Sequence, residues 1–277
     1  MVRIREVEKV LSEMLGYSFM VRALIAGVCL TLSCSLLGVD LVLKRCAMIG
    51  DSLSHVAFAA LAVSVAAGFM PTVFAFVTVS VCSFLLLKST GGKAAPEAST
   101  ALISSASLAV GVMAVSISGG VNIDVYNYLF GSILAVSRRD VILCVILALL
   151  CTLYHLLYSH RIFSVCYDEP FAKATGVKTS FFNTLSALFT SLVIVAGMKI
   201  MGSLMISALI IFPPLCAMKL CSTFRGVMLT SCAVGVVGYV LALIFSYGFS
   251  TPTGASTVCF YAVGYLCFSM GTGRGKG

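Results

Sequence analysis

The chain has 277 residues, of which 60% are hydrophobic and only 10% are charged, and its mean hydropathy is +1.10. This composition excludes a water-soluble globular protein, because too few polar side chains are present to cover its surface. It indicates a single-domain membrane protein over residues 1–277. The formal net charge of +8 does not require a nucleic-acid partner, since basic residues beside anionic lipid headgroups give the same excess.

The predicted elements are all helices, so the expected fold class is an all-α, polytopic bundle. The charged stretch at residues 1–18 predicts an amphipathic N-terminal segment. Beyond it, apolar runs long enough for a helix to cross about 30 Å of hydrocarbon predict transmembrane spans. They lie at about residues 20–39, 46–68, 71–88, 100–118, 139–159, 180–198, 200–217, 227–247 and 255–271. Pro213 and Pro214 lie inside the seventh run and can break a helix, so eight or nine full spans are expected.

The distribution of lysine and arginine predicts which loops face the cytoplasm. With the polar segment at 161–178 on the cytoplasmic side, the basic residues on that side are Lys44, Arg45, Lys88, Lys93, Arg161, Lys173, Lys178, Lys219, Arg225, Arg274 and Lys276. The opposite loops contain only Arg138, Arg139 and Lys199. This asymmetry satisfies the positive-inside rule. Nine spans place the basic residues of the N-terminal segment outside, against the rule: Arg3, Arg5, Lys9 and Arg22.

The second run begins with the stretch GDSLSH at residues 50–55, which has two interpretations. GDSLS resembles the nucleophile block of a GDSL hydrolase, but a serine nucleophile needs a histidine base and an orienting acid. The chain has no Asp-x-x-His block and no histidine after His160, so the sequence does not support hydrolysis. The second interpretation concerns Asp51 and His55, which at positions i and i+4 share one helical face.

Asp51 and His55 are predicted to lie deep in the membrane. If Arg45 marks the inner edge of the span, the two residues lie about 9 Å and about 15 Å further in, close to the bilayer midplane. An aspartate at the centre of a membrane helix costs about 2.5 to 3.5 kcal/mol, which implies a partner, a wet cavity or a ligand. One hypothesis is a structural pair whose members satisfy each other's hydrogen bonds. The other is an ion pathway, since carboxylate oxygen and imidazole nitrogen are suitable ligands for Zn²⁺ or Mn²⁺.

Two ligands from one helix are too few for a tetrahedral metal site. A two-fold homodimer would bring two copies of Asp51 and two of His55 toward one axis. Alternatively, other residues of the same chain would complete the metal's coordination. The sequence does not choose between these arrangements.

Six stretches of the chain resemble, in order and in spacing, one family of membrane proteins. They are FMVRALIAG (19–27), LLGVDLVLKRCAMIGDSLSHVAFAALA (36–62), NIDVYNYLFGSILAVS (122–137), DEPFAKATGV (168–177), MGSLMISALIIFPPLCA (201–217) and STPTGAS (250–256). The family is ABC-3, the permease subunits of bacterial zinc, manganese and iron ABC importers. The chain departs from the family pattern in having FAALA where relatives commonly have Pro-Gly, and two prolines at 213 and 214 where one is usual.

The resemblance implies roles for individual residues. In relatives the Gly-Asp-x-Leu-Ser-His block lines the metal path, which here gives Asp51 and His55. The Asn-x-Asp block resembles an extracellular gate, which adds Asp124 and Asn122 as candidates for the same path. The alternative for Asp124 is a solvated loop acid that caps a helix.

The stretch YDEPFAKATGVKT resembles the family's cytoplasmic coupling helix. Asp168 and Glu169 fit the positive end of a helix dipole, Pro170 suits the first turn, and Gly176 suits the C-terminal cap. A plain solvated loop is the alternative. The residues that the resemblance assigns to coupling with an ATPase are Asp168, Glu169, Phe171, Ala172 and Gly176.

The chain has no G-x-x-x-x-G-K-[ST] phosphate loop, and GTGRGKG at 271–277 lacks both the spacing and the Ser or Thr. It is therefore not expected to be an enzyme. The resemblance implies a separate cytoplasmic ATP-binding subunit that docks near residues 165–178, an extracytoplasmic metal-binding protein, and a second permease subunit that is identical or a paralogue. It also implies a multi-pass protein of the bacterial inner (plasma) membrane. No permanently bound cofactor is expected, because the metal is the substrate, imported by alternating access.

A standalone proton-coupled metal ion carrier is the alternative function, in which Asp51 and His55 relay protons. A structural membrane subunit is a third hypothesis. The presence of an ATPase subunit separates the importer from the carrier. The identity of the metal does not follow from the sequence, because oxygen and nitrogen donors accept Zn²⁺, Mn²⁺ and Fe²⁺.

Overall fold

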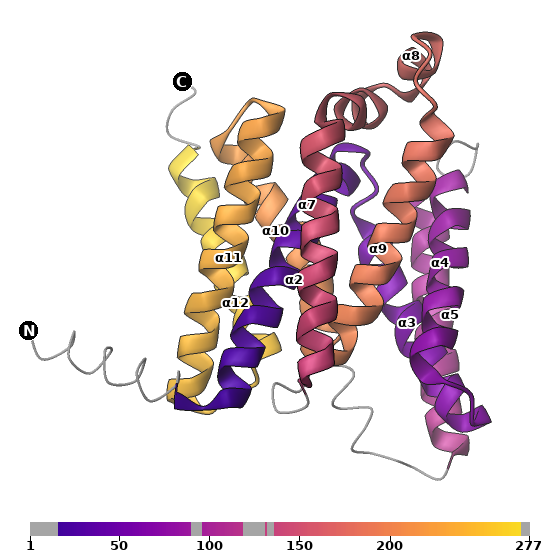
Figure 1. Ribbon diagram of the computed structural model, residues 1–277, viewed down its shortest axis with the longest axis vertical. Helices are drawn as coiled ribbons and strands as arrows, with labels where there is room; N and C mark the ends of the chain where they lie inside the picture. The colour runs from indigo at the N-terminus through magenta and orange to yellow at the C-terminus, as the bar shows by residue number, and fades with distance from the viewer. Residues whose placement is uncertain (1–15, 90–95, 119–130, 132–135, 273–277) are drawn as a thin grey trace, which may run out of the picture.

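The computed structural model describes residues 16–89, 96–118, 131 and 136–272, and every regular element in these ranges is a helix (Figure 1). The fold class is therefore the predicted all-α bundle. The helices are α2 (Ser18–Leu43), α3 (Met48–Ala67), α4 (Pro71–Ser89), α5 (Pro96–Ile117), α7 (Arg138–Tyr167), α8 (Glu169–Ala174), α9 (Thr179–Met201), α10 (Ser203–Leu220), α11 (Phe224–Phe249) and α12 (Thr253–Thr272).

Each predicted span corresponds to one long helix. Within the described ranges, eight helices are long and apolar enough to cross a membrane, and Pro71–Leu86 of α4 is a shorter apolar helix. The seventh run does not break at its prolines. It forms α10, which continues through Pro213 and Pro214. Pro213 and Pro214 therefore do not remove a span, and α10 is one of the eight helices long and apolar enough to cross a membrane.

Close packing of α2 accompanies the prolines of α10. Pro214 has no N–H, so the carbonyl of Ile210, four residues earlier, lacks its usual helical donor. Gly38 of α2 lies directly against this carbonyl, and a Cβ added to Gly38 would lie 2.1 Å from Ile210 O. Small residues allow membrane helices to approach this closely, and neighbouring helices make prolines tolerable in a span.

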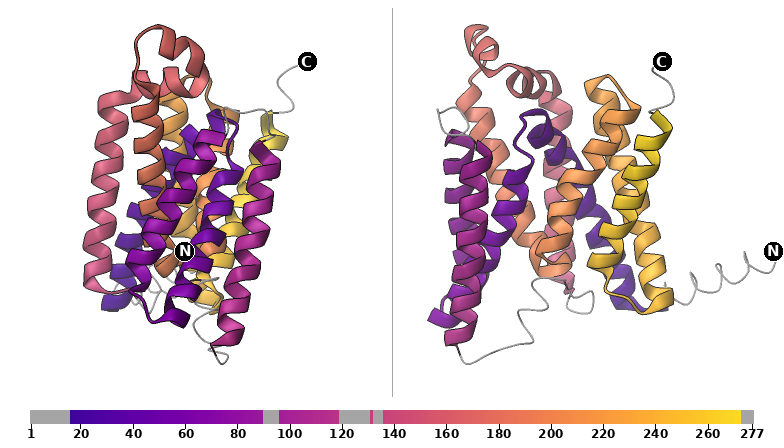
Figure 2. Two further views of the ribbon diagram at one scale, coloured as in Figure 1. Left: turned by 90° about the vertical axis from the view of Figure 1, so that its right-hand side faces the viewer. Right: turned by 180° about the vertical axis from the view of Figure 1, so that it is seen from behind.

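The bundle has a buried centre and a lipid-facing rim. α2 and α3 are central, because 72% of an 18-residue apolar stretch in each helix is buried. The corresponding stretch of α5 is only 11% buried. α11 and α12 lie at one side of the bundle and α4 and α5 at the other (Figure 2). The outer surface of α7 is made of exposed leucines, which suits contact with hydrocarbon: Leu149, Leu153, Leu156 and Leu157.

The helix directions place the charged loops at opposite ends of the bundle. α8 and the turn between α2 and α3 lie at one end, whereas α2 and α7 begin at the other (Figure 1). The cytoplasmic candidates Lys44 and Arg45 therefore share an end with α8, and Arg138 lies at the far end, as the charge distribution predicts. Arg22, one turn into α2, lies at the far end as well, so the conflict in the N-terminal segment persists.

Candidate metal site

Asp51 and His55 lie near the α8 end of α3. Arg45 has a positive φ of 57°, and the backbone N–H of Cys46 donates to Leu41 O, so a tight turn separates α2 from α3. Because α3 begins only at Met48, Asp51 belongs to its first turn, about 4.5 Å along the helix from its start. The predicted distance of about 9 Å from Arg45 assumed a continuous helix, whereas α3 begins only after the turn at 45–47.

The two side chains of the site do not satisfy each other. His55 Nε2 and Asp51 Oδ2 are 3.8 Å apart, which is too long for a hydrogen bond. His55 Nδ1 is buried and has no hydrogen-bond partner among the described residues. The His55 side chain is 22% exposed and that of Asp51 is 34% exposed. This geometry does not fit the hypothesis of a mutually satisfied structural pair, and it leaves both side chains available to a ligand.

Serine hydroxyls fix the orientation of α3 around the site. Ser54 Oγ donates to Asp51 O at 2.7 Å and lies 3.1 Å from Ser207 Oγ of α10. Ser52 Oγ donates to Thr100 O of α5 at 2.8 Å. These contacts hold α3 between α5 and α10, so that the face with Asp51 and His55 is left partly open.

Asp51 and His55, the candidate metal ligands, have no further candidate beside them in the part of the structure that is described. No group of three or more His, Cys, Asp or Glu side chains that could hold a metal occurs in these ranges. Asp51 and His55 provide one carboxylate and one imidazole, donors that fit Zn²⁺, Mn²⁺ and Fe²⁺ alike. Completion of the site by a second copy or by further residues of this chain stays a prediction.

A second aspartate–histidine pair, which the sequence analysis missed, joins α2 to α7. His155 Nε2 lies 3.1 Å from Asp40 Oδ2, and His155 Nδ1 lies 2.8 Å from Cys151 O. The two side chains are 1% and 3% exposed. Asp40 is an acid inside an apolar run, which is a usable signal. Its partner lies 115 residues further along the chain, and one sequence does not reveal such a contact.

The other two predicted ligands, Asn122 and Asp124, lie outside the described residues. Their distance from Asp51 and His55 is therefore not defined by the structure. Their assignment to a metal path stays a prediction.

The predicted coupling region forms α8, with the expected helix ends. The Asp168 side chain accepts a hydrogen bond from the backbone N–H of Phe171 at 2.9 Å, and Pro170 lies in the first turn. After the last residue of α8, Gly176 has a positive φ of 85°, and the N–H of Val177 donates to Ala172 O at 3.0 Å. This is the left-handed C-terminal termination that glycine favours.

The side chains of α8 divide into an outer and an inner set. Phe171 is 61% exposed at the end of the bundle, where a partner can contact it. Ala172 is fully buried and belongs to a cluster with Ile162, Val165 and Phe182. Its contribution in this structure is to hold α8 against α7 and α9, and a partner could not contact it directly.

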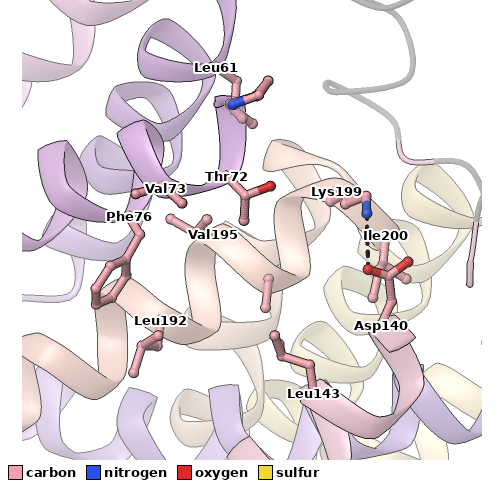
Figure 3. Close-up of a pocket in the computed structure, with 12 residues that line it drawn as sticks. Leu61, Thr72, Val73, Phe76, Asp140, Leu143, Leu192, Val195, Lys199 and Ile200 are labelled. Atoms are coloured by element: carbon pink, nitrogen blue, oxygen red, sulfur yellow. Dashed lines mark hydrogen bonds and ion pairs between the residues drawn. The ribbon is translucent and has the colours of Figure 1, made fainter. Parts of the chain in front are cut away.

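A cavity of about 460 Å³ lies away from Asp51 and His55, where α4, α7 and α9 meet at the other end of the bundle. Figure 3 shows that its charged groups, Asp140 and Lys199, face each other. Lys199 Nζ donates to Asp140 Oδ1 at 3.0 Å. The rest of the lining is mainly apolar and includes Phe76 and Val195. Because Asp140, the only carboxylate among the described lining residues, is already paired with Lys199, the described part of this cavity offers no metal site.

Comparison with known proteins gives one consistent family. The model of the ABC 3 transport family matches residues 16–272. A protein of Treponema pallidum (strain Nichols), named a probable metal transport system membrane protein, is 31% identical over 245 residues, which cover 88% of this chain and 92% of the relative. The manganese import system permease protein ScaB of Streptococcus gordonii is 26% identical over 252 residues, covering 90% of each chain.

A solved structure has the same fold. A chain of PsaBC from Streptococcus pneumoniae, in complex with a Fab, superposes with a TM-score of 0.83. The two chains are 23% identical, and the match covers 95% of each.

Proposed function

Because the chain belongs to the ABC 3 transport family, we propose that it is the membrane permease of an ATP-driven importer of a divalent transition-metal ion. It is a multi-pass protein of the bacterial plasma membrane, with eight described helices long enough to span it. The names of its relatives support a metal cargo, and the streptococcal one supports manganese. Mn²⁺ is therefore the first ion to test, with Zn²⁺ and Fe²⁺ as competitors of equal ligand chemistry.

The observation that carries this proposal is the unpartnered Nδ1 of His55 on the same helical face as the partly exposed Asp51. A buried imidazole nitrogen without a partner is costly, and a passing cation would offset that cost. The separation of 3.8 Å leaves both groups free to turn toward one ion. A permanent structural pair would instead close to hydrogen-bond distance, as Asp40 and His155 do.

The proposed cycle is alternating access. An extracytoplasmic protein delivers the ion, and a separate ATP-binding subunit docks on the exposed surface of α8 around Phe171. ATP-driven movement of α8 then changes which side of the membrane the Asp51 and His55 site faces. A second permease chain, identical or a paralogue, completes the transporter.

Metal uptake by the reconstituted complex tests the proposal. We expect Asp51→Ala and His55→Ala each to lower ATP-dependent uptake of radioactive Mn²⁺ by about tenfold or more, since either change removes one of two ligands. His160→Ala is the matched control, because His160 is an exposed histidine of α7 that lies 3.0 Å from Arg225 of α11 and is not among the proposed metal ligands. Assembly with the ATP-binding subunit is checked by size-exclusion chromatography.

Wild-type uptake by either site variant, in an intact complex, would refute the site. Uptake that needs a pH gradient but neither ATP nor an ATP-binding subunit would identify a proton-coupled carrier instead. Competition by unlabelled Zn²⁺ and Fe²⁺ in the same assay ranks the three ions.

A further inference from the structure

The last turn of α2 is tied by side chains to α7 and α9, the two helices that flank the proposed docking helix, and through α9 to α8 itself. α8 is flanked in the chain by α7 and α9, and the end of α2 lies close to both at this end of the bundle (Figure 1). Five residues make the ties, and we call them the polar clamp: Asp40, Lys44, His155, Glu169 and Asn183. None of them is among the proposed metal ligands.

The clamp binds α7 through Asp40 and His155. His155 Nδ1 must carry a proton, because its partner, Cys151 O, can only accept a hydrogen bond. His155 Nε2 then faces Asp40 Oδ2 at 3.1 Å, and this contact needs a second proton on one of the two atoms. The pair therefore holds one proton more than a neutral histidine beside an ionised aspartate would. Its side chains are nearly inaccessible to solvent, at 1% and 3% exposed. A buried, charge-assisted contact of this kind resists separation.

The clamp binds α9 and α8 through Lys44 and Asn183. Lys44 Nζ donates to Asn183 Oδ1 at 2.7 Å, and Asn183 Nδ2 donates to Glu169 Oε1 at 3.0 Å. Glu169 is the first residue of α8. The amide of Asn183 thus uses both of its ends and connects the docking helix to the end of α2.

The end of α2 leads directly to the metal site. Lys44 is the C-terminal cap of α2, and the tight turn after it is closed by the bond from Cys46 N to Leu41 O at 2.8 Å. α3 begins at Met48, and Asp51 lies in its first turn. A displacement of the last turn of α2 therefore moves the start of α3 without a flexible linker in between.

We propose that the polar clamp is the route by which movement of α8 reaches Asp51 and His55. Glu169 and Asn183 transmit the movement of α8 to Lys44 at the end of α2. The contact between Asp40 and His155 makes α7 move together with α2, and the short turn after Lys44 transmits the movement to α3. The five residues are positioning residues, since none touches the cargo. This inference rests on the proposed function of α8, and it predicts that a severed clamp uncouples ATP hydrolysis from import.

Two compensating substitutions within the polar clamp test the inference. Asn183→Asp keeps an acceptor for Lys44 but sets a carboxylate against the carboxylate of Glu169, so the link to α8 breaks. Glu169→Gln in the same chain restores a donor–acceptor pair across that link. We expect Asn183→Asp to lower Mn²⁺ import per ATP hydrolysed by about fivefold or more, within the range of measured coupling energies. The double variant is expected to return to within about twofold of Glu169→Gln alone.

The assay uses proteoliposomes with the permease, its ATP-binding subunit and the metal-binding protein, and measures ATP hydrolysis and Mn²⁺ uptake together. Thr184→Ala is the control, because Thr184 is the exposed neighbour of Asn183 on α9. If the clamp had only a structural role, Asn183→Asp would lower ATP hydrolysis and Mn²⁺ uptake in parallel, and adding Glu169→Gln would not restore the ratio between them. If Asn183→Asp does not assemble, Lys44→Met breaks the same route one bond further on and is judged by the same ratio.

Normal import per ATP in Asn183→Asp, or failure of Glu169→Gln to restore it, would overturn the inference. Asp51→Ala in the same preparation separates this result from failure of the proposed function. If Asp51→Ala imports normally, the metal site is wrong. If only the clamp variants import normally, the site stands and the route is wrong.

Discussion

The two aspartate–histidine pairs differ in the distance between their members and in their exposure, although each contains one buried polar atom with no partner among the described residues, Asp40 Oδ1 and His55 Nδ1. Asp40 and His155 meet at 3.1 Å between two helices and are shielded from solvent. Asp51 and His55 lie 3.8 Å apart on one helix and are partly exposed. The first geometry fixes two helices to each other, whereas the second leaves a carboxylate oxygen and an imidazole nitrogen free to bind a transient ligand. At the scale of single residues, this difference supports the proposal that Asp51 and His55 bind a ligand whereas Asp40 and His155 join two helices.

We predict that His155→Phe destabilises the protein strongly. It leaves the Asp40 carboxylate buried without a partner, and removing one member of a buried pair typically costs about 3 to 5 kcal/mol. Asp40→Leu added to His155→Phe removes the stranded charge and should recover most of the loss, because apolar replacement of a whole buried pair is often neutral. Thermal unfolding of the purified protein in detergent measures both effects.

His160→Phe provides the reference for this prediction, since His160 is exposed and should tolerate the change. A melting temperature for His155→Phe equal to that of His160→Phe would mean that the Asp40 contact contributes nothing to stability.

The sequence predicts Asp51 and His55 but not Asp40 and His155, and the reason is physical. Residues four apart on a helix face the same way whatever the tertiary structure, so the first pair follows from spacing alone. The second pair depends on how α7 packs against α2, which periodicity does not determine. The unpartnered Nδ1 of His55 is likewise a property of packing, and it could only be found in three dimensions.

At the scale of elements, the contact between α2 and α10 depends on a glycine. Helix propensity alone would favour alanine over glycine at position 38 by about 0.5 to 1 kcal/mol. The Cβ of an alanine would nevertheless lie 2.1 Å from Ile210 O and 2.9 Å from Pro214 Cγ. Backbone atoms do not rotate away as side chains do, so α2 and α10 would have to separate.

We therefore predict that Gly38→Ala lowers the melting temperature, with a net cost of about 1 to 3 kcal/mol, the usual range for overpacking. Gly264→Ala in α12 is the matched control, because a Cβ added there comes within 4 Å of no described atom beyond its chain neighbours and the nearby backbone of its own helix. Equal melting temperatures for the two variants would show that α10 yields easily at its prolines and that the close approach is not required.

Apolar run length predicts the helices well, because a long apolar run can bury its backbone in hydrocarbon only as a helix. It predicts their ends and breaks less well. The seventh run passes through Pro213 and Pro214 without a break, since neighbouring helices support it. The turn at 45–47, which brings Asp51 closer to the start of its helix, was not predicted from the sequence. Its positive φ lies at Arg45, and a turn of this kind is usually recognised by a glycine.

At the scale of the whole molecule, the proposed metal site has too few ligands among the described residues of a single chain. On α3, the residues Met48, Asp51 and His55 share one face and are all at least partly exposed, with Met48 51% exposed. This face contains the proposed metal site and is distinct from the exposed leucine surface of α7. Two ligands cannot hold a transition-metal ion alone in a protein site of ordinary coordination. A two-fold pair of chains would place four such ligands around one axis.

We predict one bound metal ion for every two permease chains in the assembled importer held before ATP hydrolysis. Elemental analysis of the purified complex, loaded with Mn²⁺ and passed through a desalting column, measures this ratio against protein mass. Tethering one wild-type chain to one His55→Ala chain removes one of the four shared ligands and should weaken retention of the ion without halving the number of sites. A ratio of one ion per chain, or half-occupancy in the tethered pair, would instead mean that each chain completes its own site, with ligands from the segment that contains Asn122 and Asp124 as the first to examine.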